Sequence, residues 1–369
     1  MAEVQRSPIK LGEKMKVLVT GGAGYIGSHA VRELLDSGHQ VVVLDNLSKG
    51  HEEAIDKRAA FVLASTEDVD LIVNKIKLHG IEAVMHFAAD IEVGESVTDP
   101  FKYYQNNFSN AVSLLEALNI CGVKKFVFSS TAAVYGNPER TPILESDLRN
   151  PINLYGRSKM MVEMALEDAC KAYGMGYTIL RYFNVAGASP DATIGEDHQP
   201  ESHLIPKILM AAREGTAVKI FGTDYPTSDG TCVRDYVHVM DLARAHVLAL
   251  ENLSPGKGEV FNLGSESGFS VREVISACER VTGRKITVEE GPRRAGDPAT
   301  LVASSKKIRE QLGWERKYPD METIVAHAWN WHTSHPEGYV KETEKSHFIL
   351  TEMASEEYRM AETYRYFGE

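Results

Sequence analysis

The stretch "KVLVTGGAGYIGS" (residues 16–28) runs from a short apolar segment directly into a glycine-rich turn. Gly22-x-Gly24-x-x-Gly27 has the spacing of a dinucleotide-binding turn. Counted from Gly21, the same glycines fit the related spacing with one more residue in the turn. Such turns need glycine because the backbone adopts unusual φ angles and approaches a pyrophosphate closely. We therefore expect a strand, a phosphate-binding turn and a helix whose N-terminus faces the anion.

An acidic residue stands where the next strand is expected to end. The segment "VVVLDN" (residues 41–46) places Asp45 after a continuous apolar run. A carboxylate at this position accepts hydrogen bonds from both adenosine ribose hydroxyls and repels a 2′-phosphate. The sequence therefore favours NAD over NADP, with Lys49 partly offsetting the repulsion.

Short β-branched runs alternate with helical patterns through the first half of the chain. Several runs are continuously hydrophobic, as in strands that are covered on both faces. This alternation predicts an α/β fold with a doubly wound parallel (Rossmann) sheet. The expected strands span residues 15–20, 40–45, 59–64, 83–89, 124–130 and 177–183.

The pattern changes after Asn184, where loops and smaller elements follow. We expect an NAD-binding Rossmann domain over residues 15–184 and a smaller C-terminal α/β substrate-binding lobe over 185–339. The chain is expected to cross back near 236–258. Residues 1–14 and 340–369 read as tails, and the second of these suggests no role.

Length and charge exclude several classes of protein. A chain of 369 residues has room for two lobes, because single cores stop growing at about 250–300 residues. The net charge of −12 argues against nucleic acid or an anionic membrane as partner. We also find no apolar run near the roughly 20 residues that span a bilayer, and no signal peptide in the N-terminal tail.

Cysteine and histidine spacing suggests neither disulfides nor a metal site. The four cysteines lie far apart without a CxxC pair, which is typical of reduced thiols in a cytoplasmic protein: Cys121, Cys170, Cys232 and Cys278. The segment "GEDHQPESH" (residues 195–203) has the residue types to hold a cation, but a polar loop is the better interpretation. We therefore predict no metal.

The segment "NLYGRSK" (residues 153–159) puts Tyr155 and Lys159 one turn apart on one face of an expected helix. A lone Tyr-x-x-x-Lys pair usually lies on the surface of a helix and has no chemical role. After the fifth strand of a dinucleotide fold, however, it resembles the extended short-chain dehydrogenase/reductase superfamily. The resemblance implies that the tyrosine is the general acid/base and that the lysine contacts the nicotinamide ribose and lowers the tyrosine pKa.

The proposed pKa shift is physically reasonable. Lowering a phenol from about 10 to about 7 requires roughly 4 kcal/mol in favour of the phenolate. A cation about 5 Å away, at an effective dielectric of 20, supplies about 3 kcal/mol, and a positively charged nicotinamide supplies the rest. Thr131, at the end of the fifth strand, is the expected third member, donating a hydrogen bond to the reacting sugar oxygen.

A closer resemblance follows from motifs spread over residues 15–339. "VLDNLSKGH" (43–51), "SSTAAVYG" (129–136) and especially "TSDGTCVRDYVHVMDLA" (227–243) resemble the UDP-glucose (UDP-galactose) 4-epimerases. The resemblance implies that Tyr155 takes a proton from the sugar 4-hydroxyl while C4 gives hydride to NAD. The 4-keto sugar then turns over, and hydride returns to its opposite face.

The resemblance also implies the binding residues. Those for NAD are Gly21, Gly24, Tyr25, Ile26, Gly27, Asp45, Asn46, Ser48, Ser65, Thr66, Phe87, Ala88, Ala89, Asn106, Tyr155, Lys159 and Phe183. Those for the UDP-sugar are Thr131, Asn184, His203, Leu204, Phe221, Arg234, Arg294 and Asp297. The long helical patterns at 95–120 and 155–174 suggest a homodimer formed by helix pairing.

Several positions depart from the family pattern and leave alternatives open. Ile91 replaces a lysine that some epimerases direct toward the cofactor phosphates, and Ser65-Thr66 replaces an acidic residue near adenine. His203 replaces an asparagine, and Leu301 stands where relatives vary with the sugar they accept. The alternatives are a UDP-N-acetylhexosamine or UDP-pentose epimerase, and a non-catalytic NAD sensor. A 4,6-dehydratase is disfavoured because Ala132-Ala133 provides no acid or base.

Overall fold

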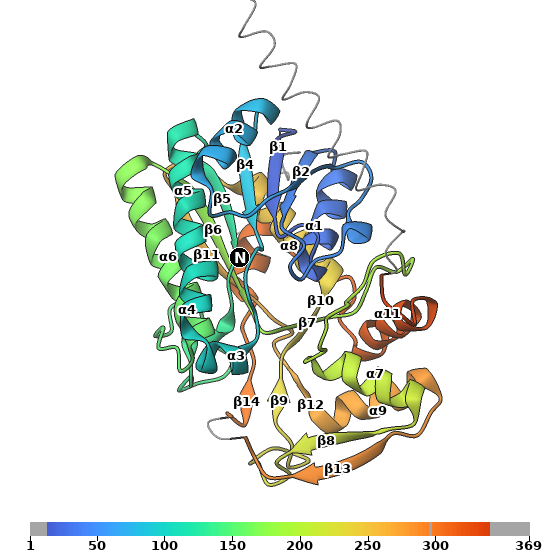
Figure 1. Ribbon diagram of the computed structural model, residues 1–369. Helices are drawn as coiled ribbons and strands as arrows, with labels where there is room; N and C mark the ends of the chain where they lie inside the picture. Colours follow the sequence, from blue (N-terminus) through green and yellow to red (C-terminus); the bar gives the residue numbers. More distant parts are fainter. Residues whose placement is uncertain (1–12, 295–296, 340–369) are drawn as a thin grey trace, which may run out of the picture. The chain divides into compact units, whose positions relative to one another are not determined.

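The computed structural model describes residues 13–294 and 297–339 (Figure 1). Its main element is a seven-stranded sheet in the order β11-β6-β5-β4-β1-β2-β3. All the pairings in this sheet are parallel. The strands are β1 (Lys16–Thr20), β2 (Gln40–Asp45), β3 (Ala60–Leu63), β4 (Ala83–His86), β5 (Lys125–Ser129), β6 (Gly176–Tyr182) and β11 (Gly258–Leu263). The predicted Rossmann sheet is confirmed.

Helices cover both faces of this sheet. The strands carry apolar side chains on each face, and these side chains are buried against the helices. In β1, Val17 and Val19 enter one hydrophobic core, whereas Leu18 enters the other. The first core is closed by α1 (Tyr25–Asp36) and α8 (Val239–Asn252). The second is closed by α2 (Val69–His79), α5 (Asn110–Cys121) and α6 (Leu154–Tyr173). Figure 1 shows α5 and α6 side by side on that face.

The chain returns to the large sheet late in the sequence. Helix α8 packs against α1, and β11 pairs with β6 from Gly258↔Tyr177 to Leu263↔Tyr182. The returning segment therefore extends beyond residues 236–258. The reason is that β6 offers an open edge, and the apolar end of β11 buries Phe261 and Leu263 in the first core.

A second set of elements builds a smaller core of its own. Its helices are α7 (Leu204–Glu214), α9 (Val271–Thr282) and α11 (Met321–Ser334), which bury apolar faces together. Its strands form short sheets: β10 (Tyr236–His238) with β7 (Asn184–Ala186), β13 (Thr287–Gly291) with β8 (Ala217–Phe221), and β12 (Phe269–Ser270) with β9 (Val233–Arg234) and β14 (Thr300–Leu301). Helix α10 (Lys306–Leu312) contacts β11.

The helical pattern expected over 95–120 is divided in the structure. It contains α3 (Val93–Thr98), α4 (Pro100–Tyr103) and a π-helix over Tyr104–Ser109 before α5. The division comes at Asp99 and Pro100, because proline lacks an N–H and Asp99 caps the new helix at Lys102 N. None of the described helices is long and apolar enough to cross a membrane.

A buried ion pair joins α6 to the sheet. Arg181 on β6 donates to Glu163 on α6 through Nε and Nη2, at 2.9 and 2.6 Å. Both side chains are almost completely inaccessible to water. Ser130 donates to the same carboxylate at 2.6 Å, and Arg181 also donates to the Tyr135 hydroxyl at 2.7 Å. The hydrogen bonds therefore satisfy both charges, as a buried pair requires.

We expect Glu163→Gln to lower the free energy of unfolding by about 3–5 kcal/mol, because it leaves the Arg181 charge buried without a counter-charge. The measurement is urea unfolding followed by circular dichroism. The matched control is Glu322→Gln in the exposed pair with Arg280, for which we expect less than about 1 kcal/mol. Equal losses in the two variants would contradict the assignment.

Candidate active site

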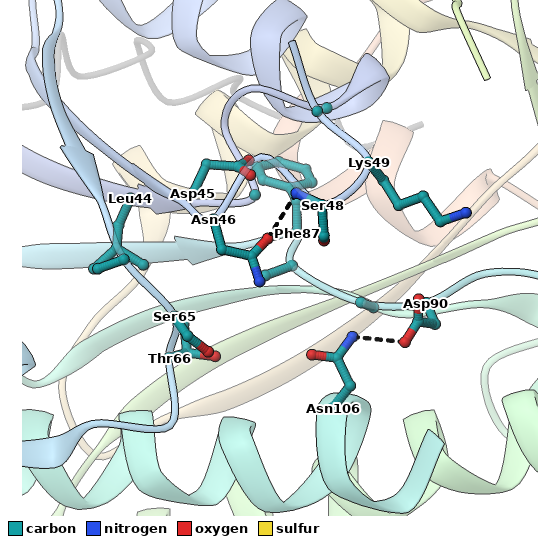
Figure 2. A pocket seen from close by; sticks show the side chains of 16 residues that line it. Leu44, Asp45, Asn46, Ser48, Lys49, Ser65, Thr66, Phe87, Asp90 and Asn106 are labelled. Carbon is teal, nitrogen blue, oxygen red and sulfur yellow. Dashed lines mark hydrogen bonds between the residues drawn. The ribbon is translucent and has the colours of Figure 1, made fainter. Parts of the chain in front are cut away.

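The strand order reverses between β1 and β4, and a pocket lies beyond the carboxyl ends of β1 to β4. In doubly wound sheets, ligands bind at this switch point. Eleven of the predicted NAD-binding residues line the pocket (Figure 2): Gly21, Gly24, Asp45, Asn46, Ser48, Ser65, Thr66, Phe87, Ala88, Ala89 and Asn106. The structure therefore brings together side chains that are up to 85 positions apart in the sequence.

The glycine turn fits a closely approaching phosphate. Gly21 has φ +73°, and a Cβ there would lie 2.5 Å from the backbone nitrogen of Ala88. A Cβ on Gly27 would lie 2.0 Å from the Gly21 carbonyl oxygen. Gly24 is the N-cap of α1 and provides no side-chain cap, so an anion can approach the N-terminus of the helix closely. The turn is therefore shaped for the pyrophosphate of a dinucleotide.

Asp45 is held in place by backbone donors at the end of β2. Its carboxylate accepts from Ala23 N at 3.0 Å and from Leu47 N at 2.9 Å. Burial raises the pKa of Asp45, and these N–H donors partly offset that effect. Each carboxylate oxygen keeps acceptor capacity for a ribose hydroxyl.

The π-helix turns two asparagines toward the pocket side of the fold. Asn106 Nδ2 donates to Asp90 Oδ2 at 2.9 Å, as Figure 2 shows. Asn107 Nδ2 donates to Asp90 O at 2.9 Å and to Ser158 Oγ at 3.2 Å. Ser158 precedes Lys159 on α6, so Asn107 links the nucleotide pocket to the helix that carries the tyrosine and the lysine.

The three predicted catalytic residues lie at the ends of β5 and α6. The Asn153 side chain caps α6 by accepting a hydrogen bond from Gly156 N at 2.8 Å. This cap places Tyr155 and Lys159 in the first two turns of the helix. Lys159 Nζ donates to Ser129 O at 3.0 Å, immediately before the loop that holds Thr131. Thr131 also lies near enough to Tyr155 to lower the pKa of its phenol.

Burial shifts the pKa values of the predicted catalytic pair. It raises the pKa of Tyr155 to about 12, although the nearby Thr131 lowers it. Burial lowers the pKa of Lys159 to about 7, opposed by Glu163. In the chain alone, desolvation therefore disfavours both charged forms. A lower tyrosine pKa in the presence of the nicotinamide stays a prediction.

The predicted phosphate-binding residues form a group at one end of the smaller sheets. Arg234 and Asp297 form an ion pair, and the Arg294 guanidinium lies 4.1 Å above the Phe221 ring. Asn184 Nδ2 donates to Asp235 O at 3.0 Å, which ties β7 to the residue after Arg234. Two guanidinium groups and a carboxylate suit a nucleoside diphosphate.

Leu301 lies beside these residues. It pairs with Arg234 in the register of β14 and β9. With Phe183 it also packs against the small hydrophobic cluster of Ala132, Val134, Tyr135 and Ile143, which follows Thr131. Leu301 thus lies between the predicted phosphate-binding residues and the hydrophobic cluster next to the predicted catalytic Thr131.

The remaining predicted residues take other positions. The Tyr25 hydroxyl donates to Gly187 O at 2.7 Å, and Ile26 packs against the first core, so these side chains do not line the pocket. Leu204 begins α7 and packs against the smaller core. His203 caps that helix, and its Nδ1 lies among carboxylates.

Sequence reasoning missed Asp90 and the Glu163–Arg181 pair. Asp90 lines the pocket and orients Asn106 and Asn107. Its position directly after the fourth strand, in "HFAAD" (residues 86–90), was an available signal. The buried pair had none, because two charges 18 positions apart look like surface residues in a sequence.

Comparison with known proteins gives a consistent result. The model of the NAD dependent epimerase/dehydratase family matches residues 17–264. A UDP-glucose 4-epimerase from Lacticaseibacillus casei is 53% identical over 327 residues, or 88% of this chain and 99% of that protein. The structure of a UDP-glucose 4-epimerase from Brucella ovis in complex with NAD has TM-score 0.83 at 45% identity, covering 86% of this chain and 98% of that one. The UDP-Glc/GlcNAc 4-epimerase from Campylobacter jejuni has TM-score 0.76 at 44% identity, covering 87% and 99%.

We expect Gly27→Ala to reduce NAD bound to the purified protein by at least roughly tenfold, since a cost of 1.4 kcal/mol or more is enough for that change. The added Cβ meets the Gly21 carbonyl and forces the turn open. NAD is measured by enzymatic cycling after acid extraction, with circular dichroism as the check on folding. Gly94→Ala is the control, because a Cβ there meets nothing within 4 Å. Normal NAD content in Gly27→Ala would contradict the assignment of the glycine turn to NAD binding.

Proposed function

Because this chain belongs to the NAD dependent epimerase/dehydratase family, we propose that it interconverts UDP-galactose and UDP-glucose by reversible oxidation at C4 of the sugar. The proposal rests above all on one observation. Thr131, after the end of β5, lies near enough to Tyr155 to lower its pKa, and the buried Lys159 donates to Ser129 O from a helix that Asn107 links to the nucleotide pocket. Relatives that share about half of this sequence are UDP-glucose 4-epimerases.

NAD, when bound, supplies a reversible hydride acceptor for C4. The residues of the chain do the rest. Tyr155 receives the proton of the 4-hydroxyl and later returns it, while Thr131 orients the same oxygen. Lys159 stabilises the phenolate form of Tyr155. Lys159 follows Tyr155 by one turn on the same helix, which is the spacing that this role requires.

The group at the other end holds the UDP moiety in this proposal. Arg234 and Arg294 bind the diphosphate oxygens, and Asp297 accepts from ribose hydroxyls. The Arg234–Asp297 pair orients both side chains before the substrate arrives. We propose that residues 15–184, with the returning segment, bind NAD, and that the other elements of residues 185–339 bind the nucleotide sugar.

The choice of sugar is a separate matter. Leu301 borders the reacting end of the site through its packing beside Phe183. A similar protein from Campylobacter jejuni is described as acting on both Glc and GlcNAc nucleotides. We propose UDP-glucose and UDP-galactose as the principal pair, because a branched leucine at position 301 leaves less room for an N-acetyl group than a small residue would.

The assay that tests the function incubates purified protein with UDP-galactose and separates the products by chromatography. We expect UDP-glucose to form without added NADH or a second substrate. UDP-N-acetylgalactosamine and UDP-xylose run in parallel and test the alternative sugars. A protein that binds NAD but converts none of the three is a sensor instead of an epimerase.

We expect Tyr155→Phe to lower kcat by about 10²–10⁴-fold, which is the usual contribution of a general acid/base. The content of bound NAD stays the same, because the ring and the helix are unchanged. The control is Tyr173→Phe at the exposed C-terminal end of the same helix, which keeps full activity. Full activity in Tyr155→Phe would exclude the mechanism.

We also propose a cytoplasmic homodimer. The four cysteines are free, as expected in a reducing compartment. The helices of the 95–120 and 155–174 regions expose large apolar side chains, among them Val97, Phe101 and Met164. We expect light scattering to give the mass of a dimer and Phe101→Glu to shift it toward the monomer. Leu78→Glu, at a similarly exposed position on α2, should not; a monomeric parent protein would contradict the proposal.

A further inference from the structure

The loop "GEDHQPESH" (residues 195–203) brings four side chains to one point: Glu196, His198, Glu201 and His203. Each offers one nitrogen or oxygen atom, and these atoms all lie within 4.8 Å of one another. His203 Nδ1 lies 2.8 Å from Glu196 Oε1, and His198 Nδ1 lies 3.2 Å from the same oxygen. His198 Nδ1 is also 3.8 Å from Glu201 Oε2.

These separations suit a metal ion. Zinc binds imidazole nitrogens and carboxylate oxygens at about 2.1 Å, so two ligands of a tetrahedral site lie about 3.4 Å apart. The three distances above lie on both sides of that value. The four residues alternate along a single loop, which allows the small adjustments that a bound ion needs.

A second feature points to a ligand. Glu196 Oε1 and His198 Nδ1 are fully buried and aimed into the cluster, yet within the part of the chain that the structure describes neither makes a hydrogen bond of acceptable geometry. The Glu196 side chain is 4% exposed. A buried carboxylate oxygen without a well-aligned donor is costly, whereas a cation placed between the converging atoms satisfies it.

The formal charges also match. The carboxylates of Glu196 and Glu201 carry two negative charges, which one divalent cation neutralises. The loop therefore binds such an ion without building up buried charge.

Neighbouring elements hold the ligands in position. Trp331 on α11 donates from Nε1 to Glu196 O at 3.1 Å. Gly195 packs so closely on the Trp331 ring that a Cβ would lie 2.3 Å from it. His203 precedes α7, and the Glu201 carboxylate accepts from the Ser202 and His203 backbone nitrogens, both at 2.7 Å. The cluster is thus fixed between two helices of the smaller core.

We propose that Glu196, His198, Glu201 and His203 bind one zinc ion, which fastens this loop to α7 and α11. Imidazole ligands favour zinc and its first-row neighbours over magnesium and calcium. Four protein ligands leave no open position, as in structural sites. A metal site thus takes the place of the interpretation as a polar loop without metal that the sequence alone favoured. It also assigns Nδ1 of His203 to the ion and leaves only Nε2 for the nucleotide.

The test uses the full-length chain without a histidine tag. After gel filtration, plasma mass spectrometry is expected to find about one zinc per chain. Removal of the ion with a chelator lowers the melting temperature, and ZnCl2 restores it whereas MgCl2 does not. Cobalt in place of zinc gives the visible absorption of a four-coordinate site. A wild-type protein without stoichiometric zinc and without a zinc-dependent melting temperature overturns the proposal.

Two variants assign the ligands. We expect Glu196→Gln and His198→Gln to hold less than about a tenth of an equivalent of zinc, because each loses a ligand. The control His327→Gln alters a histidine on α11 that contacts His238 outside the cluster, and it keeps the metal. If both ligand variants retain zinc, the ion is bound elsewhere. If the variants fold poorly, the proposal is still tested, because the zinc content of the wild-type protein and the effect of removing its zinc are measured without them.

Discussion

The position of the proposed catalytic groups depends on the ion pair between Glu163 and Arg181. Glu163 lies one turn beyond Lys159 on α6, and Arg181 lies on the neighbouring strand β6. Ser130 and Tyr135, on either side of Thr131, bond to the same pair. The helix that carries Tyr155 and Lys159 and the loop that carries Thr131 are therefore both anchored to this buried ion pair. Two charges in a dry environment tolerate little displacement, so the geometry of the site is set by electrostatics beneath it.

Burial also explains the shifted pKa values of Tyr155 and Lys159. Burial moves the pKa of Tyr155 up and that of Lys159 down, so the resting chain favours a neutral phenol and an easily deprotonated amine. Each group alone is a poor ion. In the mechanism that we propose, an ammonium group on Lys159 would stabilise a phenolate on Tyr155.

Features that depend on local spacing were predictable from the sequence. Strand positions follow from apolar runs, and the glycine turn and Asp45 follow from their distances along the chain. The low pKa expected for Tyr155 stays a prediction, because it depends on a bound nicotinamide as well as on Lys159, whereas burial in the chain alone raises the pKa. Asp90, the Glu163–Arg181 pair and the membership of β11 in the large sheet depend on contacts between distant segments. Charged residues in a sequence look solvated, and only the fold shows which ones lose their water.

The late return of the chain to the large sheet has a consequence for how the protein is made. Strand β6 is complete at Tyr182, but its partner β11 ends only at Leu263. At usual rates of synthesis the ribosome needs on the order of 4 to 16 s to supply the roughly 80 residues between them. During that interval β6 is an open edge of apolar residues, which is a template for pairing with other chains. Trp314, buried in the first core, arrives later still. The nucleotide-binding half, although first in the sequence, is thus among the last parts to be completed, and the nascent chain is exposed to aggregation until then.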